Sequence, residues 1–307
     1  MAMKSTRRVL VAVKPDGQAD ALVASGASLA KALGAQLQII SVFEPPLIAF
    51  DPIPGVLPGI GPNLIETHST KVLTHLTGML SGLARKHSSG LEVSTALMRG
   101  TAKHVIVEEA DAPDVAAVVV GTGRSTHRFV PTGWSVVLSL MARAKAPVLT
   151  VPQDAELDLG GVHARLLVAD DLREKSLAAV ELGFEMAARL NKATVRHVHV
   201  EQAFLETVGP IDFPIPDDAR GAVGDYVMTK LKSRGHKLKQ ALIRSGGQCE
   251  EFMTSGPVDR AVTVEVESFK PDLIIFGRHR GFTQVASFGQ LPFYAMLAFG
   301  SPVLVVP

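Results

Sequence analysis

Short, almost uninterrupted apolar runs alternate along this chain with segments in which apolar residues recur every three or four positions. The runs, such as 9–13, are typical of strands buried on both faces of a parallel sheet. The periodic segments, such as the one carrying Leu22, Gly26, Leu29 and Leu33, are typical of amphipathic helices. The alternation predicts an α/β fold in which helices cover both faces of a doubly wound parallel sheet.

The alternating pattern occurs twice in the chain. Four blocks recur in the same order at an offset near 156 residues, which indicates an internal repeat. They are RRVLVAV (7–13) with ARLLVAD (164–170), ALGAQLQIISVFE (32–44) with RLNKATVRHVHVE (189–201), APDVAAVVVG (112–121) with KPDLIIFG (270–277), and APVLTVP (146–152) with SPVLVVP (301–307). We therefore predict two copies of one domain, residues 1–152 and 163–307, with residues 153–162 as a polar, glycine-containing linker.

The last strand of each copy, 148–151 and 303–306, is short, apolar and close to the end of its domain. An unpaired apolar edge strand is a liability, and pairing the two strands with each other would remove both edges. We therefore expect the copies to pack together as a pseudo-dimer within one chain. The sequence leaves open whether two chains pair further as a homodimer.

Composition narrows the class of function. The 31 Lys and Arg residues nearly balance the 30 Asp and Glu residues, which argues against a nucleic-acid or membrane-surface role based on bulk charge. The single cysteine, Cys249, excludes an intrachain disulfide. The apolar stretch after the basic N-terminus is too short for a secretion signal, and no apolar run is long enough to cross a membrane. We expect a cytoplasmic protein.

Each copy also carries a long loop rich in proline and apolar residues, FDPIPGVLPGIGPN (50–63) and IDFPIPDDARG (211–221). Loops of this apolarity must pack against another surface. The sequence leaves open whether each loop covers a ligand crevice, contacts the other copy or a partner, or packs on its own helices.

The strand openings VLVAV and LLVAD, and the endings PVLTVP and PVLVVP, resemble the universal stress protein family over nearly the whole of both copies. The stretch PTGW (131–134) is similar to the first half of the two-domain E type of this family. The resemblance implies an adenine nucleotide alpha hydrolase-like, Rossmann-like domain with a five-stranded parallel sheet of order 3-2-1-4-5. It also implies an ATP site in which an Asp after the first strand lies near the ribose and adenine. A G-x2-G-x9-G-[ST] loop after the fourth strand would hold the phosphates.

Both copies depart from the phosphate loop of the family. Arg124 and Arg280 stand where the pattern has its second glycine. The last glycine comes twelve residues after the first, at Gly133 after Gly121 and at Gly289 after Gly277, one fewer than the pattern requires. The hydroxyl that should follow it is replaced by Trp134 and Gln290. Each lost hydrogen bond to a charged group weakens binding by about 1.5–3 kcal/mol, although the arginines would recover part of it.

The acid after the first strand distinguishes the copies. Asp170 occupies the position of the family Asp in the second copy, whereas Lys14 or Pro15 fills it in the first, with Asp16 beyond the strand end. The candidate nucleotide-binding residues of the second copy are Asp170, Gly277, His279, Arg280, Gly289 and Gln290. The corresponding degenerate set of the first copy is Asp16, Gly121, Arg124 and Gly133. In the alternative interpretation, Asp170 or Asp171 caps the following helix and the glycines only serve their turns.

Two smaller candidates are interpreted as structural. His197 and His199 alternate on one strand face, but no third metal ligand lies nearby in sequence, so we expect a packed His pair and no metal site. Glu250 and Glu251 beside Cys249 should raise the pKa of its thiol, which disfavours a reactive thiolate.

Two main functions follow from these features, and a weaker third is a scaffold whose only function is protein association. The first is a non-enzymatic stress protein that binds a partner or a small, partly apolar molecule, with no certain cofactor and no catalytic residue. The alternative is a switch that binds ATP or another adenine nucleotide in the second copy only and hydrolyses it weakly.

Overall fold

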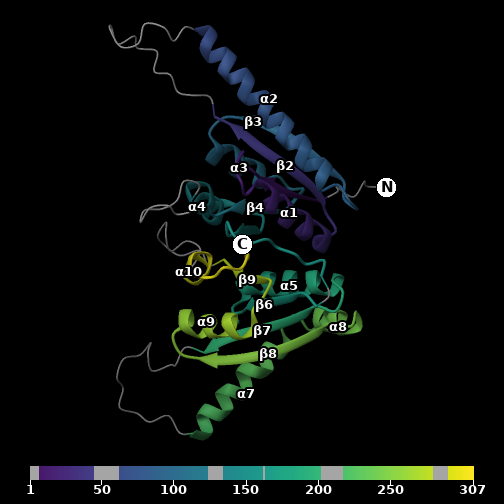
Figure 1. Ribbon diagram of the computed structural model, residues 1–307. Helices are drawn as coiled ribbons and strands as arrows, with labels where there is room; N and C mark the ends of the chain where they lie inside the picture. Colours follow the sequence, from purple (N-terminus) through teal and green to yellow (C-terminus); the bar gives the residue numbers. More distant parts are fainter. Residues whose placement is uncertain (1–6, 45–61, 124–133, 162, 202–216, 279–289) are drawn as a thin grey trace, which may run out of the picture.

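The computed structural model of the protein describes residues 7–44, 62–123, 134–161, 163–201, 217–278 and 290–307. Its strands and helices alternate along the chain, as the hydrophobic pattern predicts (Figure 1). Both Pro-rich loops lie largely outside the described residues.

The two copies contain matching sets of strands. The first copy has β1 (Arg8–Ala12), β2 (Gln36–Phe43), β3 (Val93–Arg99), β4 (Val115–Gly121) and β5 (Val148–Val151). The second has β6 (Arg165–Ala169), β7 (Thr194–Glu201), β8 (Gln248–Ser255), β9 (Leu273–Gly277) and β10 (Val303–Val306).

The helices match less closely. The first copy has α1 (Ala19–Leu33), α2 (Pro62–Lys86), α3 (Ala102–Ala110) and α4 (Trp134–Arg143). The second has the 3-10 helix η1 (Glu174–Ser176), α5 (Leu177–Arg189), α7 (Asp217–Ser233), α8 (His236–Arg244), α9 (Val258–Phe269) and α10 (Gln290–Ala298). The long helix α2 of the first copy therefore corresponds to two helices, α7 and α8, which are separated by a break at Gly235.

All strands join one ten-stranded sheet of order β3-β2-β1-β4-β5-β10-β9-β6-β7-β8. Each copy is a parallel sheet of order 3-2-1-4-5, which confirms the predicted doubly wound topology. The core residues form two clusters, one on each face of the sheet. Helices α1, α2, α5 and α8 contribute to one cluster, and α3, α4, α9 and α10 contribute to the other.

The copies meet at an antiparallel pair of strands, as predicted. Leu304 of β10 lies opposite Leu149 of β5, and both are completely buried. The hydroxyl of Thr150 donates a further hydrogen bond to the carbonyl of Val303 at 3.2 Å. The two apolar edge strands therefore become the centre of the sheet.

Side chains from the second copy also hold the ends of helices in the first. Arg189 of α5 donates to the carbonyl of Leu33, at the end of α1, over 2.5 Å. The buried Arg278, directly after β9, donates to the carbonyl of Met141 in α4 over 3.0 Å. Helix-end carbonyls lack partners within their own helix, so arginine is well suited to both positions.

The segment that follows β5 packs closely against the first copy. Leu157 and Leu159 are buried, and their backbone amides donate to the hydroxyls of Ser25 and Ser28 on α1.

Within the described part of the chain, no helix has both the length and the apolarity needed to cross a membrane.

We predict that Leu304→Ala lowers the free energy of unfolding by about 2–5 kcal/mol, the usual effect of a large-to-small change in a core. Because β5 and β10 share the sheet, the fluorescence of Trp134 in the first copy should report the same shifted transition as the circular dichroism of the whole chain. A urea titration that records fluorescence and circular dichroism on the same samples tests whether the two transitions coincide. Val264→Ala, at an exposed valine, is the control and should change stability by less than about 0.5 kcal/mol. Two separate transitions would contradict the prediction.

Candidate functional site

Asp170 lies at the carboxyl end of β6, where the chain turns toward α5. Its amide donates to the carbonyl of Val198 at 2.8 Å, which extends the strand pairing by one residue. The turn is closed by the amide of Leu172, which donates to Asp170 Oδ1 at 2.9 Å while Leu172 adopts a left-handed φ of 60°. Such Asx turns are a common local role of aspartate.

The carboxylate of Asp170 is buried and receives four hydrogen bonds. Oδ1 accepts from the Leu172 amide and, at 2.7 Å, from the hydroxyl of Ser176. Oδ2 accepts from Nε2 of His197 at 3.0 Å and from Nε of Arg234 at 2.6 Å. Two carboxylate oxygens offer about four lone-pair positions, so this set leaves no position open for a ligand.

The break between α7 and α8 places Arg234 against Asp170. Gly235 has a left-handed φ of 63° and turns the chain directly after Arg234. The buried ammonium of Lys239, on α8, donates to the carbonyl of Leu231 near the end of α7 at 2.8 Å, so it links the two helices across the break. Arg234 also donates to the carbonyl of Arg173 and the hydroxyl of Ser176, so its guanidinium links the break between α7 and α8 to the turn of residues 170–176.

Burial and hydrogen bonding set the charges of this cluster. Burial tends to raise the pKa of Asp170, but the hydrogen bonds from His197, Ser176 and Arg234 outweigh it and hold the pKa well below its usual value. Burial lowers the pKa of His197, and the hydrogen bond to Asp170 offsets this only in part. The cluster is therefore an aspartate–arginine ion pair with a neutral imidazole that donates from Nε2. Among the described residues, Nδ1 of His197 has no hydrogen-bond partner.

The first copy has apolar residues at the same places. Strand register pairs Ala12 with Ile40 and Ala169 with Val198, so Val13 corresponds to Asp170. The prediction that Lys14 or Pro15 fills this position was therefore wrong by at least one residue. The same register makes Ile39 the counterpart of His197.

The two candidate glycines allow the end of the fourth strand to approach the helix that follows the first strand. A Cβ atom on Gly277 would lie 3.0 Å from Cα of Ser176, which is backbone. A Cβ atom on Gly121 would lie 2.5 Å from Oε1 of Gln18. Both glycines therefore have a packing role that needs no ligand.

A cleft of about 400 Å³ opens beside Asp170 in the second copy. Its walls are mostly apolar, and they include Val198, Val200, Val258, Val262, Phe276, Leu291 and Pro292. Its polar residues are Asp170, Asp171, Arg173, Ser176, His199 and Glu201. The imidazole Nδ1 of His199 lies 2.8 Å from the carbonyl of Asp170, so the two histidines contact the same aspartate.

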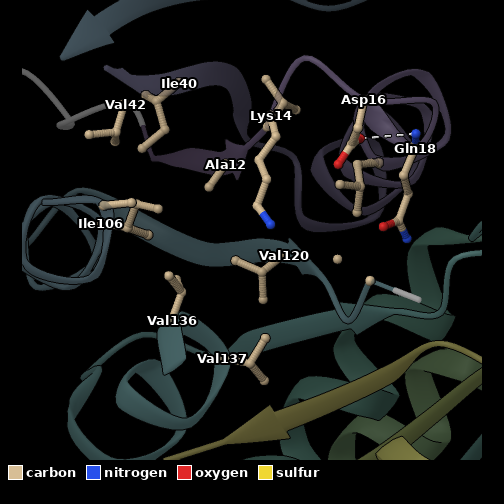
Figure 2. Close-up of a pocket in the computed structure, with 15 residues that line it drawn as sticks. Ala12, Lys14, Asp16, Gln18, Ile40, Val42, Ile106, Val120, Val136 and Val137 are labelled. Atoms are coloured by element: carbon tan, nitrogen blue, oxygen red, sulfur yellow. Dashed lines mark hydrogen bonds between the residues drawn. The ribbon is translucent and has the colours of Figure 1, made fainter. Parts of the chain in front are cut away.

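A smaller cavity of about 90 Å³ occupies the equivalent place in the first copy (Figure 2). Lys14 extends over it from the end of β1 (Figure 2). Asp16 lies nearer to Gln18, whose backbone N–H donates to Asp16 Oδ1 at 3.1 Å. The two cavities share their position in the fold but differ in size and charge.

Several predicted site residues lie outside the described residues. They are Arg124 and Gly133 in the first copy, and His279, Arg280 and Gly289 in the second. Gln290 is the first residue of α10. The predicted effects of the shortened loops and their arginines thus stay predictions.

Cys249 lies half-buried on β8. Burial and the nearby Glu251 raise the pKa of its thiol to about 12, in the direction that the sequence predicts. The part of the chain that the structure describes contains no group of three or more His, Cys, Asp or Glu side chains that could hold a metal ion.

The sequence did not identify Arg234, Ser176 or His197 as partners of Asp170. Arg234 is 64 residues away from Asp170, so local spacing gives no sign of the contact. Two signals were present: a glycine directly after Arg234, inside an otherwise helical segment, and a histidine on a strand that is apolar in the first copy.

Comparison with known proteins shows which family the chain matches. A model described as "Universal stress protein family" matches residues 5–152 and 163–307. A universal stress protein from Archaeoglobus fulgidus DSM 4304 superposes with a TM-score of 0.67 at 13% identity, covering 97% of each chain. A universal stress protein from Pseudomonas aeruginosa UCBPP-PA14 gives 0.63 at 14% identity, covering 98% of this chain and 93% of its own. These likenesses concern the fold alone. The chain matches no curated protein sequence.

We predict that Asp170→Asn destabilises the protein by about 3–5 kcal/mol at pH 7, because it leaves the largely buried Arg234 guanidinium without its counter-charge. The folded-state pKa of Asp170 is lowered, so its stabilisation is complete above the ordinary pKa and is lost as pH falls through the folded-state value. The difference between wild type and variant should therefore narrow below about pH 4.

Urea denaturation at a series of pH values measures this difference. Asp20→Asn is the control, because Asp20 pairs with Lys86 at the surface and should contribute less than about 1 kcal/mol. Equal effects of the two substitutions would contradict the structural role of Asp170.

Proposed function

The chain belongs to the universal stress protein family, and from this premise we propose that it is a non-enzymatic stress protein that binds a small, partly apolar ligand in the cleft of its second copy. In this proposal the ligand is held and released unchanged. Binding of the ligand, or a change in the protein that follows binding, would act as the signal in the stress response.

The saturated carboxylate of Asp170 carries this proposal. The family resemblance assigns this acid to the ribose and adenine of ATP, but here all its lone pairs are used by groups of the protein. A ribose hydroxyl would have to displace Ser176, His197 or Arg234, leaving a buried donor without a partner. Such a loss costs about 1–3 kcal/mol, and more for a charged group.

The walls of the cleft support an apolar ligand. Val262 and Phe276 form its buried interior, and Val200 and Leu291 continue the apolar surface toward solvent. The polar side chains Arg173, His199 and Glu201 could orient a ligand by hydrogen bonds. A mostly apolar cavity with a few polar groups is typical of small-molecule sites.

The alternative function remains an ATP-binding switch with weak hydrolysis in the second copy. It requires the backbone and arginine around residues 278–290 to supply most of the phosphate contacts, with little help from Asp170. The two functions differ in the ligand that stabilises the protein.

A pair of substitutions on one helix tests the proposed site. Val258 lines the cleft at the start of α9, whereas Val264 is exposed on the same helix and does not line it. We predict that Val258→Glu weakens binding of the apolar fluorophore 1-anilinonaphthalene-8-sulfonate at least tenfold, because it places a carboxylate in an apolar wall. Val264→Glu should leave binding unchanged. Fluorescence titration measures both affinities.

Thermal shift distinguishes the alternative, because a ligand that binds only the folded state raises Tm. We expect millimolar ATP or AMP to raise Tm by less than about 1 °C. A shift of several degrees with ATP that Val258→Glu abolishes would contradict the proposal and favour the switch. Mass spectrometry of molecules that co-purify with the wild-type chain would then identify the natural ligand.

A further inference from the structure

His199 on β7 lines the cleft of the second copy, and its contact with the backbone fixes which ring nitrogen carries the proton. Nδ1 lies 2.8 Å from the carbonyl oxygen of Asp170. A carbonyl oxygen only accepts hydrogen bonds, so Nδ1 carries a proton and donates it. In the neutral imidazole, Nε2 is therefore a hydrogen-bond acceptor. His199 is half-buried, and among the described residues its Nε2 has no hydrogen-bond partner.

The polar groups around Asp170 are already used within the protein. The carboxylate of Asp170 accepts four hydrogen bonds. The hydroxyl of Ser176 donates to that carboxylate at 2.7 Å and accepts from Arg234 at 2.9 Å. Asp171 accepts from the amide of Arg173 at 3.0 Å, and its other oxygen lies 3.6 Å from Nε of the same arginine. A ligand therefore finds few unused polar groups at this end of the cleft.

Glu201, the last residue of β7, is the second acceptor on the cleft wall. Alternation along a strand places His199 and Glu201 on the same face of the sheet. The two acceptors differ in what a ligand must overcome to reach them. A charged carboxylate is strongly hydrated and costly to desolvate, whereas a neutral imidazole nitrogen costs less. A neutral donor in the ligand is therefore better matched to Nε2 of His199.

The first copy offers a different residue at this place. Strand register makes Ser41 the counterpart of His199, and Ser41 is buried. The first-copy cavity is lined instead by its neighbours Ile40 and Val42. An imidazole acceptor at the end of the second strand is thus a feature that distinguishes the cleft of the second copy from that cavity.

We propose that the cleft selects a neutral, apolar ligand that carries an N–H or O–H donor, and that Nε2 of His199 accepts this hydrogen bond. The proposal rests on the function proposed for the cleft and adds the polar group that the ligand must have. The apolar body of the ligand packs against Val262 and Phe276. At about 400 Å³, the cleft lies within the usual size range of small-molecule sites.

A pair of ligands of the same shape tests the proposal. Indole has one N–H donor and no conventional acceptor, and benzofuran has an ether oxygen in place of that N–H. In nitrogen-15 NMR titrations of the full-length chain, both should shift the amide signals of Val200, Val262 and Gly277, which border the cleft. We expect indole to bind about three- to tenfold more tightly, the effect of one net hydrogen bond.

Two substitutions of His199 separate its two nitrogens. His199→Asn places an amide N–H near the position of Nδ1, so the contact with Asp170 is kept, but it has no atom at the position of Nε2. This variant should lose the preference for indole. His199→Gln places an amide oxygen near the position of Nε2 and should retain a preference of at least about twofold. His236→Asn, at an exposed histidine of α8, is the matched control and should behave as wild type.

Each preference is a ratio of two affinities measured on one variant, so a general loss of stability does not mimic the expected result. Equal binding of indole and benzofuran by the wild type would overturn the proposal while leaving the cleft function intact. An unchanged preference in His199→Asn would also overturn it, and its loss in Glu201→Met alone would assign the acceptor to Glu201 instead. Binding of neither ligand would contradict this proposal and the cleft function together.

Discussion

The antiparallel pairing of β5 with β10 is the contact on which the rest of the structure depends. Each strand has four residues, all buried, and would be an unpaired apolar edge if its domain stood alone. Pairing them removes both edges and merges two five-stranded sheets into one. It also lets α5 reach α1, so the core on that face extends across both copies. The two halves are thus parts of one folded body as well as repeats of one another.

The two copies fill the same positions of the fold with residues of different polarity. Where β1 and β2 bring Val13 and Ile39 into the core, β6 and β7 bring Asp170 and His197. Buried charges are costly unless paired, and Arg234 supplies the pair. It reaches Asp170 because α7 ends at Ser233 and the chain turns at Gly235, whereas α2 runs unbroken for 25 residues. The break between α7 and α8 is therefore what allows the ion pair between Arg234 and Asp170 to form.

The sequence predicted the repeat, the doubly wound sheet and the pairing of the copies, because these depend on apolar periodicity and on the need to cover apolar edges. It could not predict the environment of Asp170. Arg234 reaches that carboxylate only through a turn in the chain far away in sequence, which no local motif encodes. It also misplaced the counterpart of Asp170, since a single repeat offset ignores the small insertions between strands. The matched opening blocks RRVLVAV and ARLLVAD, by contrast, align Val13 with Asp170, and the strand register agrees with that alignment.

The two copies place different side chains at the same position of one fold. A glycine ends the fourth strand in both copies; Gly277 lies against the backbone of Ser176, whereas Gly121 lies against the side chain of Gln18. What varies is the charge that side chains bring to that place: a saturated carboxylate in one copy and a lysine in the other. Arg234 neutralises the carboxylate of Asp170, and the other charged residues along the cleft are Asp171, Arg173 and Glu201. The same sheet therefore carries two cavities whose linings differ in size and charge, and this difference comes from a few side chains at the strand ends.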